Sequence, residues 1–226
     1  MQKKWVISLG GSRIVPEEVD EKFLKEFDNL IKKYRSHKFV IVAGGGSVAR
    51  KYISALQKLG KTTKKQSLLG IVVTRLNALL MTKVLGKRAN EVIPQNMKQV
   101  KNLLRKNQVV FCGALRYKEK NTSDGTAADL AAYLKCSFIN LTNVRGLYTA
   151  NPKTHKNARF IKKISWKNFY GIANKIKYKA GQHFVLDQSA AKIILNKKIP
   201  TYIVGSLKDI EGIMAGKGFK GTFVGD

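Results

Sequence analysis

Two glycine-rich turns near the start of the chain constrain the fold most, because each directly follows an apolar run. Apolar residues 5–9 lead into the first turn at 10–12, and apolar residues 39–43 lead into the second at 44–47. Glycine after a strand lets the backbone adopt positive φ and approach a bound group closely. A helix that begins there points free N–H groups at that group, and phosphate is the anion that suits them best. The two turns together predict a pocket for more than one phosphate.

Strand and helix patterns alternate along the rest of the chain. Strands are predicted at 4–9, 38–43, 91–94, 108–113, 138–141, 200–205 and 221–224, the last at a sheet edge. Helices are predicted at 17–35, 48–59, 67–85, 97–106, 125–135, 186–196 and 210–215. This alternation favours an α/β fold, a mostly parallel sheet covered by helices on both faces. Ligands of such sheets bind at the carboxyl ends of the strands, where both glycine turns and the loops 113–124 and 142–152 lie.

Length and composition indicate a globular protein without linker, repeat or low-complexity tract. The chain has 226 residues, of which 44% are hydrophobic, enough for a sizeable core in one large domain or two small lobes. No run approaches 18 uninterrupted apolar residues and no apolar signal region precedes the first strand, so we expect no membrane segment and a cytoplasmic location. With only Cys112 and Cys136, a disulfide framework is not expected, and both cysteines should act as small hydrophobes near core strands.

The charge balance is strongly positive. Lys and Arg total 43 against 14 Asp and Glu, a formal net charge of +29. Such a field attracts polyanions, which include nucleic acid, nucleotides and anionic membranes. The alternative is a host whose proteins are generally basic or whose cytosol is rich in salt. The lysines are spread along the chain and form no single block, so both interpretations stay open.

Several common site chemistries find no support in the sequence. There is no G-x-x-x-x-G-K-[ST] segment, so a P-loop NTPase is excluded. Residues 44–49 fit the dinucleotide pattern G-x-G-x-x-A, but positions 60–70 lack the acid that would bind a ribose. No Cys/His cluster suggests zinc, and no G-x-S-x-G nucleophile elbow occurs. The three histidines, His37, His155 and His183, lie far apart and give little support to histidine-based catalysis.

Six segments together resemble a known family. SLGGS at 8–12, GGGSVARKY at 44–52 and GIVVTRLNA at 70–78 are similar to the amino-acid-kinase superfamily, with the closest likeness to its archaeal type of uridylate kinase. Three later segments agree, at 122–128, 142–152 and 180–194. The likeness covers the whole chain in order. Jointly the motifs are specific for the superfamily and less specific for the substrate.

The resemblance implies an architecture and a reaction. The architecture is a three-layer αβα sandwich, one amino-acid-kinase domain over 1–226, with the acceptor bound mainly by the N-terminal part and ATP mainly by the C-terminal part. Such proteins usually assemble into homo-hexamers. The implied reaction transfers the γ-phosphoryl of ATP to UMP in pyrimidine nucleotide biosynthesis. Mg²⁺ would be held mainly through the nucleotide phosphates, without a protein ligand set. No membrane partner and only weak, non-specific nucleic-acid binding are expected.

The resemblance also assigns roles to individual residues. Asp124, Arg50 and Gly11 would act in catalysis, with Asp124 orienting catalytic groups or the metal. ATP would contact Ser8, Gly10, Gly11, Ser12, Gly46, Arg50, Thr142, Asn143, Tyr148 and Asn151. UMP would contact Gly44, Gly45, Ser67, Asn121, Thr122 and Ser123. No general base is required, because the acceptor is already a phosphate oxygen, and catalysis consists of in-line positioning and charge cancellation.

Other residues depart from the family pattern or allow a plainer interpretation. Ser8 stands where many members carry lysine, and Ser67 where an acid normally contacts the acceptor ribose. Arg145 and Asn151 each replace an aspartate, and the loop 115–120 is longer than usual. These changes keep two alternatives open: a divergent, weakly active relative that binds nucleotides or nucleic acid, and a kinase of another small phosphate or carboxylate.

Three of the named side chains also have structural interpretations. Asp124 is expected to cap the helix 125–135 as well as act in the site, and Asp187 to be a helix cap only. Tyr148 is interpreted equally well as a packing residue.

Overall fold

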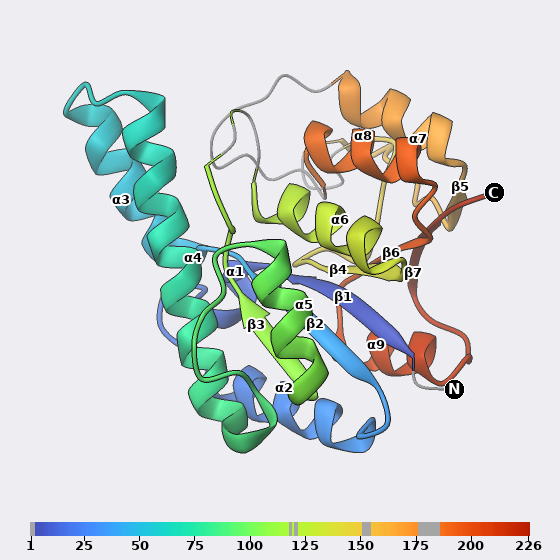
Figure 1. The fold of residues 1–226 in the computed structure, drawn as a ribbon. Helices are drawn as coiled ribbons and strands as arrows, with labels where there is room; N and C mark the ends of the chain where they lie inside the picture. The colour runs from blue at the N-terminus through green and yellow to red at the C-terminus, as the bar shows by residue number, and fades with distance from the viewer. Residues whose placement is uncertain (1–2, 118, 120–121, 151–154, 176–185) are drawn as a thin grey trace.

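The computed structural model describes residues 3–117, 119, 122–150, 155–175 and 186–226, and its centre is a seven-stranded sheet (Figure 1). The strand order is β3-β2-β1-β4-β6-β7-β5, and every neighbouring pair is parallel except β6 and β7. The strands are β1 Lys4–Leu9, β2 Lys38–Ala43, β3 Val109–Cys112, β4 Ser137–Leu141, β5 Lys163–Ile164, β6 Thr201–Val204 and β7 Gly221–Val224. The predicted mostly parallel α/β fold is confirmed.

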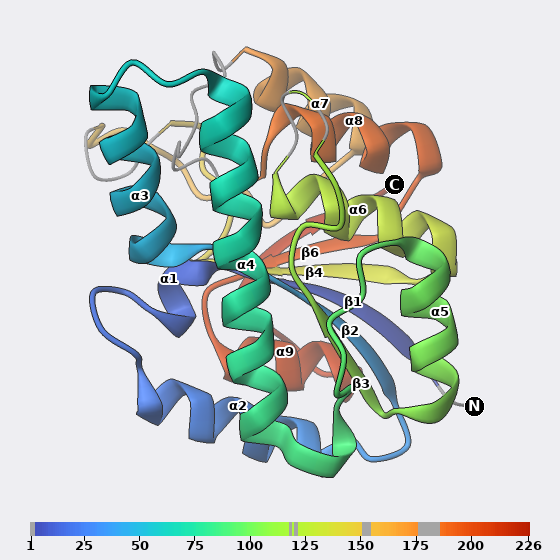
Figure 2. The ribbon, with the colours of Figure 1, turned by 60° about the vertical axis from the view of Figure 1, so that its left-hand side comes forward.

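Helices cover both faces of the sheet and make three layers (Figures 1 and 2). They are α1 Gly11–Ile14, α2 Glu21–Lys33, α3 Gly46–Lys58, α4 Thr63–Leu85, α5 Met97–Lys106, α6 Ser123–Leu134, α7 Trp166–Asn174, α8 Gln188–Lys197 and α9 Leu207–Met214, with the 3₁₀ turn η1 Gly86–Arg88. Alternate side chains of the buried strands feed two apolar clusters, as the period of two requires. Ile7 and Phe39 belong to the cluster that α1, α2, α4 and α9 share, and Val6 and Val40 to the one that α5, α6, α7 and α8 share.

Most predicted elements are present, and the differences have local causes. Residues 91–94 form no strand, because the Asn90 side chain bonds to the Val92 carbonyl oxygen at 2.9 Å and turns the chain. β7 is not an edge strand, since the unpredicted two-residue strand β5 lies beyond it. The predicted helix 17–35 begins only at Glu21, where Asp20 caps it, and α1 and α7 were not predicted.

The two cysteines occupy apolar places, as predicted. Cys112 is fully buried in β3, and half-buried Cys136 lies just before β4 in the same apolar layer. Both thiols are free, and burial raises the pKa of Cys112 to about 12.

Helices α3 and α4 pack together as a hairpin that extends from one end of the sheet (Figure 1). The span Thr63–Arg88, which includes α4, is long and apolar enough to cross a membrane by length and composition alone, although the sequence led us to expect no membrane segment. Core helices pass the same test, and 39% of the apolar window is buried here. The buried face of α4 packs on β2 and β3 and includes the polar residues Thr74 and Asn77.

Candidate active site

The two glycine turns interlock at the carboxyl ends of the adjacent parallel strands β1 and β2. A Cβ atom on Gly11 would lie 2.0 Å from the Gly46 nitrogen, and one on Gly44 would lie 2.5 Å from the Gly11 nitrogen. Gly46 has a φ of +64°, which L side chains rarely adopt. The close approach of the turns therefore requires glycine at these positions, and the prediction that the turns form one site gains a geometric basis.

The turns leave only some of their backbone donors for a ligand. The Gly10 N–H donates to Leu141 O at 3.1 Å, and the Gly44 N–H donates to Leu9 O at 2.9 Å. These two glycines, both predicted to contact nucleotide, therefore shape the turns without offering an N–H group. Helices α1 and α3 begin at Gly11 and Gly46, and the first N–H groups of a helix have no partner within it.

Side chains from one turn of helix α4 form hydrogen bonds to the second glycine turn and to the loop after β3. The Asn77 side-chain nitrogen donates to Gly44 O at 2.8 Å, and Asn77 is only 4% exposed. The Thr74 hydroxyl accepts from the Ala114 N–H at 2.9 Å, and Arg75 donates to Leu115 O at 2.7 Å. These residues belong to the motif at 70–78, but the sequence alone assigned no role to them. Polar side chains within an otherwise apolar helix were the signal that could have identified them.

Asp124 lies beside the first glycine turn through a bond to Ser8. Helix α6 packs on β1, and Ser8 Oγ lies 2.5 Å from Asp124 Oδ1, with the hydroxyl donating. Burial raises the pKa of Asp124 to about 7; the charge of Asp187 adds to the increase and the Ser8 bond opposes it. The predicted capping role of Asp124 is wrong, because Thr122 is the N-cap and its hydroxyl accepts from the Asp124 N–H at 3.1 Å. Thr122 can satisfy that N–H because it precedes the helix, whereas Asp124 lies inside the first turn.

Asp187 caps helix α8, as predicted, and also reaches the start of α6. Its carboxylate accepts from the Ala190 N–H at 2.7 Å and from the Thr122 hydroxyl. The residue is 5% exposed, and burial raises the pKa of its carboxyl against the hydrogen bonds that it accepts. The contact with Thr122 was not predicted from the sequence.

The remaining predicted site residues are less closely grouped. Arg50 lies one turn into α3, half-buried, and the half-buried Ser12 and Ser123 lie in the first turns of α1 and α6. Half-buried Gly45 is the N-cap of α3. Ser67 lies ten residues before Asn77 on α4, about 15 Å along the helix axis, away from the glycine turns.

The loop that follows β4 carries the residues predicted to hold the donor base. Half-buried Thr142 and exposed Asn143 follow the strand directly. The Tyr148 ring packs edge-on against Phe160 with centroids 5.4 Å apart, which supports its interpretation as a packing residue, and Arg145 lies over the same Phe160 ring. Asn121 and Asn151 lie outside the described residues.

The side chains of this end of the sheet do not form a dedicated metal site. Within the described ranges, no group of three or more His, Cys, Asp and Glu residues could hold a metal ion. Asp124 and Asp187 are the nearby carboxyls, and each is hydrogen-bonded within the protein. Mg²⁺ commonly keeps several waters and binds through substrate phosphates, which suits an ion that arrives with a nucleotide.

Comparison with known proteins identifies the family. The model of the amino acid kinase family matches residues 3–205. The chain belongs to the amino acid kinase family. Uridylate kinase of Thermococcus kodakarensis is 36% identical over 202 residues, covering 88% of this chain and 89% of the relative. Uridylate kinase of Archaeoglobus fulgidus is 37% identical over 224 residues, covering 98% of both chains.

Solved structures agree with this amino acid kinase assignment. The crystal structure of uridylate kinase from Archaeoglobus fulgidus matches with a TM-score of 0.83 and 33% identity, covering 98% of this chain and 99% of the other. UMP kinase from Ureaplasma parvum matches with a TM-score of 0.80 at 20% identity, covering all of both chains, and supports the fold alone. The family predicted from the sequence motifs is confirmed.

Proposed function

We propose that the protein is an ATP-dependent UMP kinase that forms UDP. The observation that carries the proposal is the interlocked pair of glycine turns with Asp124 beside them, in a chain 36–37% identical to archaeal proteins named uridylate kinase. One turn would receive the donor phosphates and the other the acceptor phosphate. Phosphoryl transfer between two nucleotides needs alignment and charge compensation more than covalent chemistry, and preorganised backbone donors supply both.

The individual contacts that we propose are those that the family resemblance assigns. For ATP we propose Ser8, Ser12, Arg50, Thr142, Asn143, Tyr148, Asn151 and the backbone of Gly10, Gly11 and Gly46. For UMP we propose Ser67, Asn121, Thr122, Ser123 and the backbone of Gly44 and Gly45. Mg²⁺ would enter as the MgATP substrate. Asp124, as a carboxylate, would orient the cationic groups around the transferred phosphoryl, and 1–226 would act as one cytoplasmic domain.

The test is a coupled assay of ATP consumption against a panel of nucleoside monophosphates and small acids, with and without Mg²⁺. We expect Mg²⁺-dependent turnover with UMP above all other acceptors. Turnover with a different acceptor would keep the kinase and replace the substrate. No turnover with any acceptor, alongside retained nucleotide binding, would favour the divergent relative that the changes at Ser67, Arg145 and Asn151 leave open.

We also propose that copies of the chain associate through α4, as part of the homo-hexamer that the resemblance implies. Four apolar side chains spaced by four, four and three residues share one exposed face of that helix. They are Leu68, Val72, Leu76 and Leu79, exposed by 44%, 58%, 59% and 37%. A contiguous exposed apolar stripe is typical of an interaction surface. A second copy is the occupant we favour, because two such helices cover each other's stripe in a closed symmetric contact.

Light scattering on the purified protein tests the association. Val72→Asp should lower the measured mass, whereas the control Val92→Asp, at an apolar residue 72% exposed outside the stripe, should leave it unchanged. A wild-type protein of monomer mass would overturn the proposal.

A further inference from the structure

Two carboxyl groups meet where α6 and α8 begin, and Thr122 lies between them. Its hydroxyl donates to Asp187 and accepts from the Asp124 N–H at 3.1 Å. Asp124 in turn accepts from Ser8 at the end of β1. One chain of hydrogen bonds therefore connects the N-cap of α8, the first turn of α6 and the strand that leads into the first glycine turn.

The two carboxyls are held unequally. Asp187 accepts hydrogen bonds from the Thr122 hydroxyl and from backbone N–H groups that include that of Ala190. Asp124 accepts one bond from a described side chain, that of Ser8. Burial raises the pKa of both carboxyls, but hydrogen bonds to a carboxylate favour its charged form, and Asp187 accepts more of them than Asp124 does.

We propose that Asp187 is a positioning residue that acts through Asp124: it fixes the start of α6 through Thr122 and holds a second negative charge beside the Asp124 carboxyl. The role rests on the proposed kinase function and extends it. A cap alone would need only the bond to the Ala190 N–H, which serine or asparagine would also accept. The bond to Thr122 and the neighbouring carboxyl are additional, and they connect the cap to the site.

Among the described residues around Asp124, Asp187 is the charge that acts on it. β1 presents the non-titrating Ser8, and the residue before α6 is the non-titrating Thr122. The next acid on α6 is Asp129, which lines a hollow at the other end of the helix, and Lys192 on α8 is exposed. Of the described charged groups, Asp187 is the one that raises the pKa of Asp124 electrostatically.

This pair makes the proposed activity sensitive to pH near neutrality. The ionised Asp124 accepts the Ser8 hydroxyl and is the form that can orient cationic groups around a phosphate. With a pKa of about 7 in the nucleotide-free protein, that form gains population as the pH rises through 7. Removal of the Asp187 charge should therefore move the acid limb of the rate profile to lower pH. Like charges at short range shift a pKa by about one unit or more.

The experiment compares pH profiles of kcat and KM for wild type, Asp187→Asn and Asp20→Asn. Asp20→Asn is the matched control, because Asp20 caps α2 by accepting the Phe23 N–H at 2.9 Å and lies outside the site. Carboxyl ¹³C NMR follows the titration of Asp124 directly without nucleotide, so this result does not depend on kinase activity. Asp187→Ser, a neutral residue that also caps helices, provides a second variant should the asparagine variant fold poorly.

We expect the acid limb of kcat and the NMR titration of Asp124 to move down by about one pH unit in Asp187→Asn, with a smaller effect on KM. Asp20→Asn should titrate like wild type. An unchanged Asp124 titration in both position-187 variants would overturn the inference, as would an equal loss of kcat at every pH, which is the signature of a cap alone. If the wild type shows no turnover but the Asp124 titration moves down in Asp187→Asn as expected, only the proposed kinase function is rejected.

Discussion

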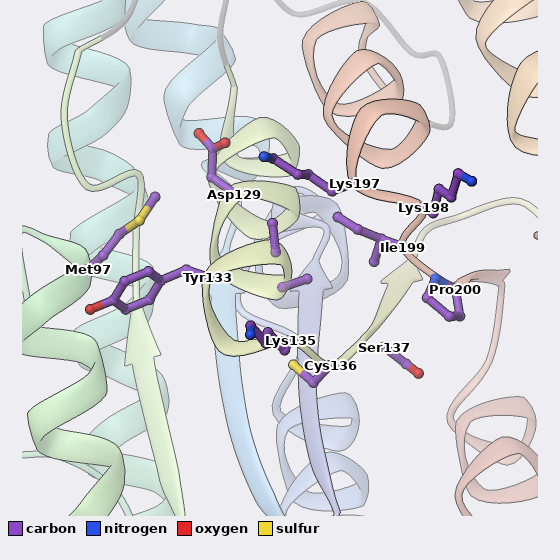
Figure 3. Close-up of a pocket in the computed structure, with 12 residues that line it drawn as sticks. Met97, Asp129, Tyr133, Lys135, Cys136, Ser137, Lys197, Lys198, Ile199 and Pro200 are labelled. Atoms are coloured by element: carbon purple, nitrogen blue, oxygen red, sulfur yellow. The ribbon is translucent and has the colours of Figure 1, made fainter.

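The two ends of helix α6 are built from different chemistry, although both contact α8 and the central sheet. The N-terminal end combines Asp124, Thr122 and Ser8 with interlocked glycine turns. The C-terminal end lines a hollow of about 740 Å³ with Tyr133, Lys135 and Cys136, and Figure 3 shows Lys197, Lys198 and Asp129 around it. The hollow is a depression open to solvent, and its lysines lie at helix C-termini, where cations offset the carbonyl dipoles.

The volume of a hollow alone therefore does not identify the functional site. Lys135 and Lys198 end α6 and α8 in the left-handed conformation, and the neighbouring Lys197 is the last residue of α8. The positive charge of these lysines stabilises α6 and α8, because the lysines lie at the C-termini of those helices. At the opposite end, polar side chains bond to each other beside the interlocked glycine turns, where we propose that phosphate binds. We therefore expect substitutions at the N-terminal end of α6 to lower turnover and substitutions at the hollow to leave it unchanged.

The largest difference should come from equivalent substitutions in the first turn of α6 and beside the hollow. Asp124→Asn should lower turnover with UMP by on the order of 10²-fold, because the carboxylate orients charge around the transferred phosphoryl. Asp129→Asn, on the same helix at the hollow, should leave turnover near the wild-type value. Steady-state kinetics at pH 8 measures both. A larger loss of turnover in Asp129→Asn than in Asp124→Asn would instead place the active site at the hollow.

Asn77 and Asn107 allow a second comparison, between the carboxyl and amino ends of the sheet. Asn77→Ala leaves the Gly44 carbonyl oxygen without its bond, so turnover should fall by roughly tenfold to a hundredfold as the turn shifts. Its unfolding free energy should fall by about 1–3 kcal/mol. The control is Asn107→Ala at the amino end of the sheet, where Asn107 Nδ2 donates to Leu103 O at 2.9 Å. That variant should lose stability and keep turnover; equal kinetic losses would show that Asn77 has only a structural role.

Sequence reasoning succeeded where the signal was local. Apolar runs followed by glycine placed β1, β2 and the pocket end of the sheet, and the spacing of apolar residues gave the bounds of α5, residues 97–106. It could not find β5, because two residues carry no period and depend on pairing with β7. It also missed Thr74, Arg75 and Asn77, whose partners are backbone atoms about 33 to 40 residues away in sequence.

Asp124 shows the same limit at the level of one residue. Its type and its position before the predicted helix 125–135 suggested an N-cap, but which residue caps depends on where the helix begins, and α6 begins at Ser123. Its high pKa arises from burial and from Asp187, 63 positions later in the chain. Charge environments of this kind require the tertiary structure.

The site end should also carry a measurable stability cost. The folded-state pKa of Asp124 is raised from 3.8 to about 7, so its contribution to stability is present below pH 3.8 and is lost as the pH rises through 7. Asp124→Asn should therefore raise the melting temperature at pH 8 and change it little near pH 4. Calorimetry at both pH values checks the sign. A variant less stable than wild type at pH 8 would contradict the assigned pKa.

Substitutions at the hollow should also gain stability, but without a loss of turnover. Lys135 and Lys198 have φ values of 50° and 48°, where glycine avoids a steric cost of about 1 kcal/mol. Lys135→Gly and Lys198→Gly should each raise the unfolding free energy by about that amount. Lys197→Gly, at the last helical residue of α8, where φ is not positive, should lower it by at most about 1 kcal/mol. Denaturant titration measures these changes, and altered UMP turnover in the position-135 variant would assign the hollow a role in function.

The smallest expected effect concerns the lysines of the whole chain. If the net charge of +29 serves nucleic-acid binding, many lysines must meet phosphates at once, and log K against log[salt] should have a slope of about −0.9 per neutralised phosphate on duplex DNA. We expect only weak, sequence-independent binding that disappears near physiological salt, because the lysines are spread over many elements and the sequence contains no recognition-helix motif or interleaved aromatic and basic residues. Fluorescence anisotropy at about 150 mM salt decides the question. Tight binding there with a preference for one RNA or DNA would promote nucleic-acid binding over general basicity as the reason for the charge, and the comparison between the two ends would then describe only part of the function.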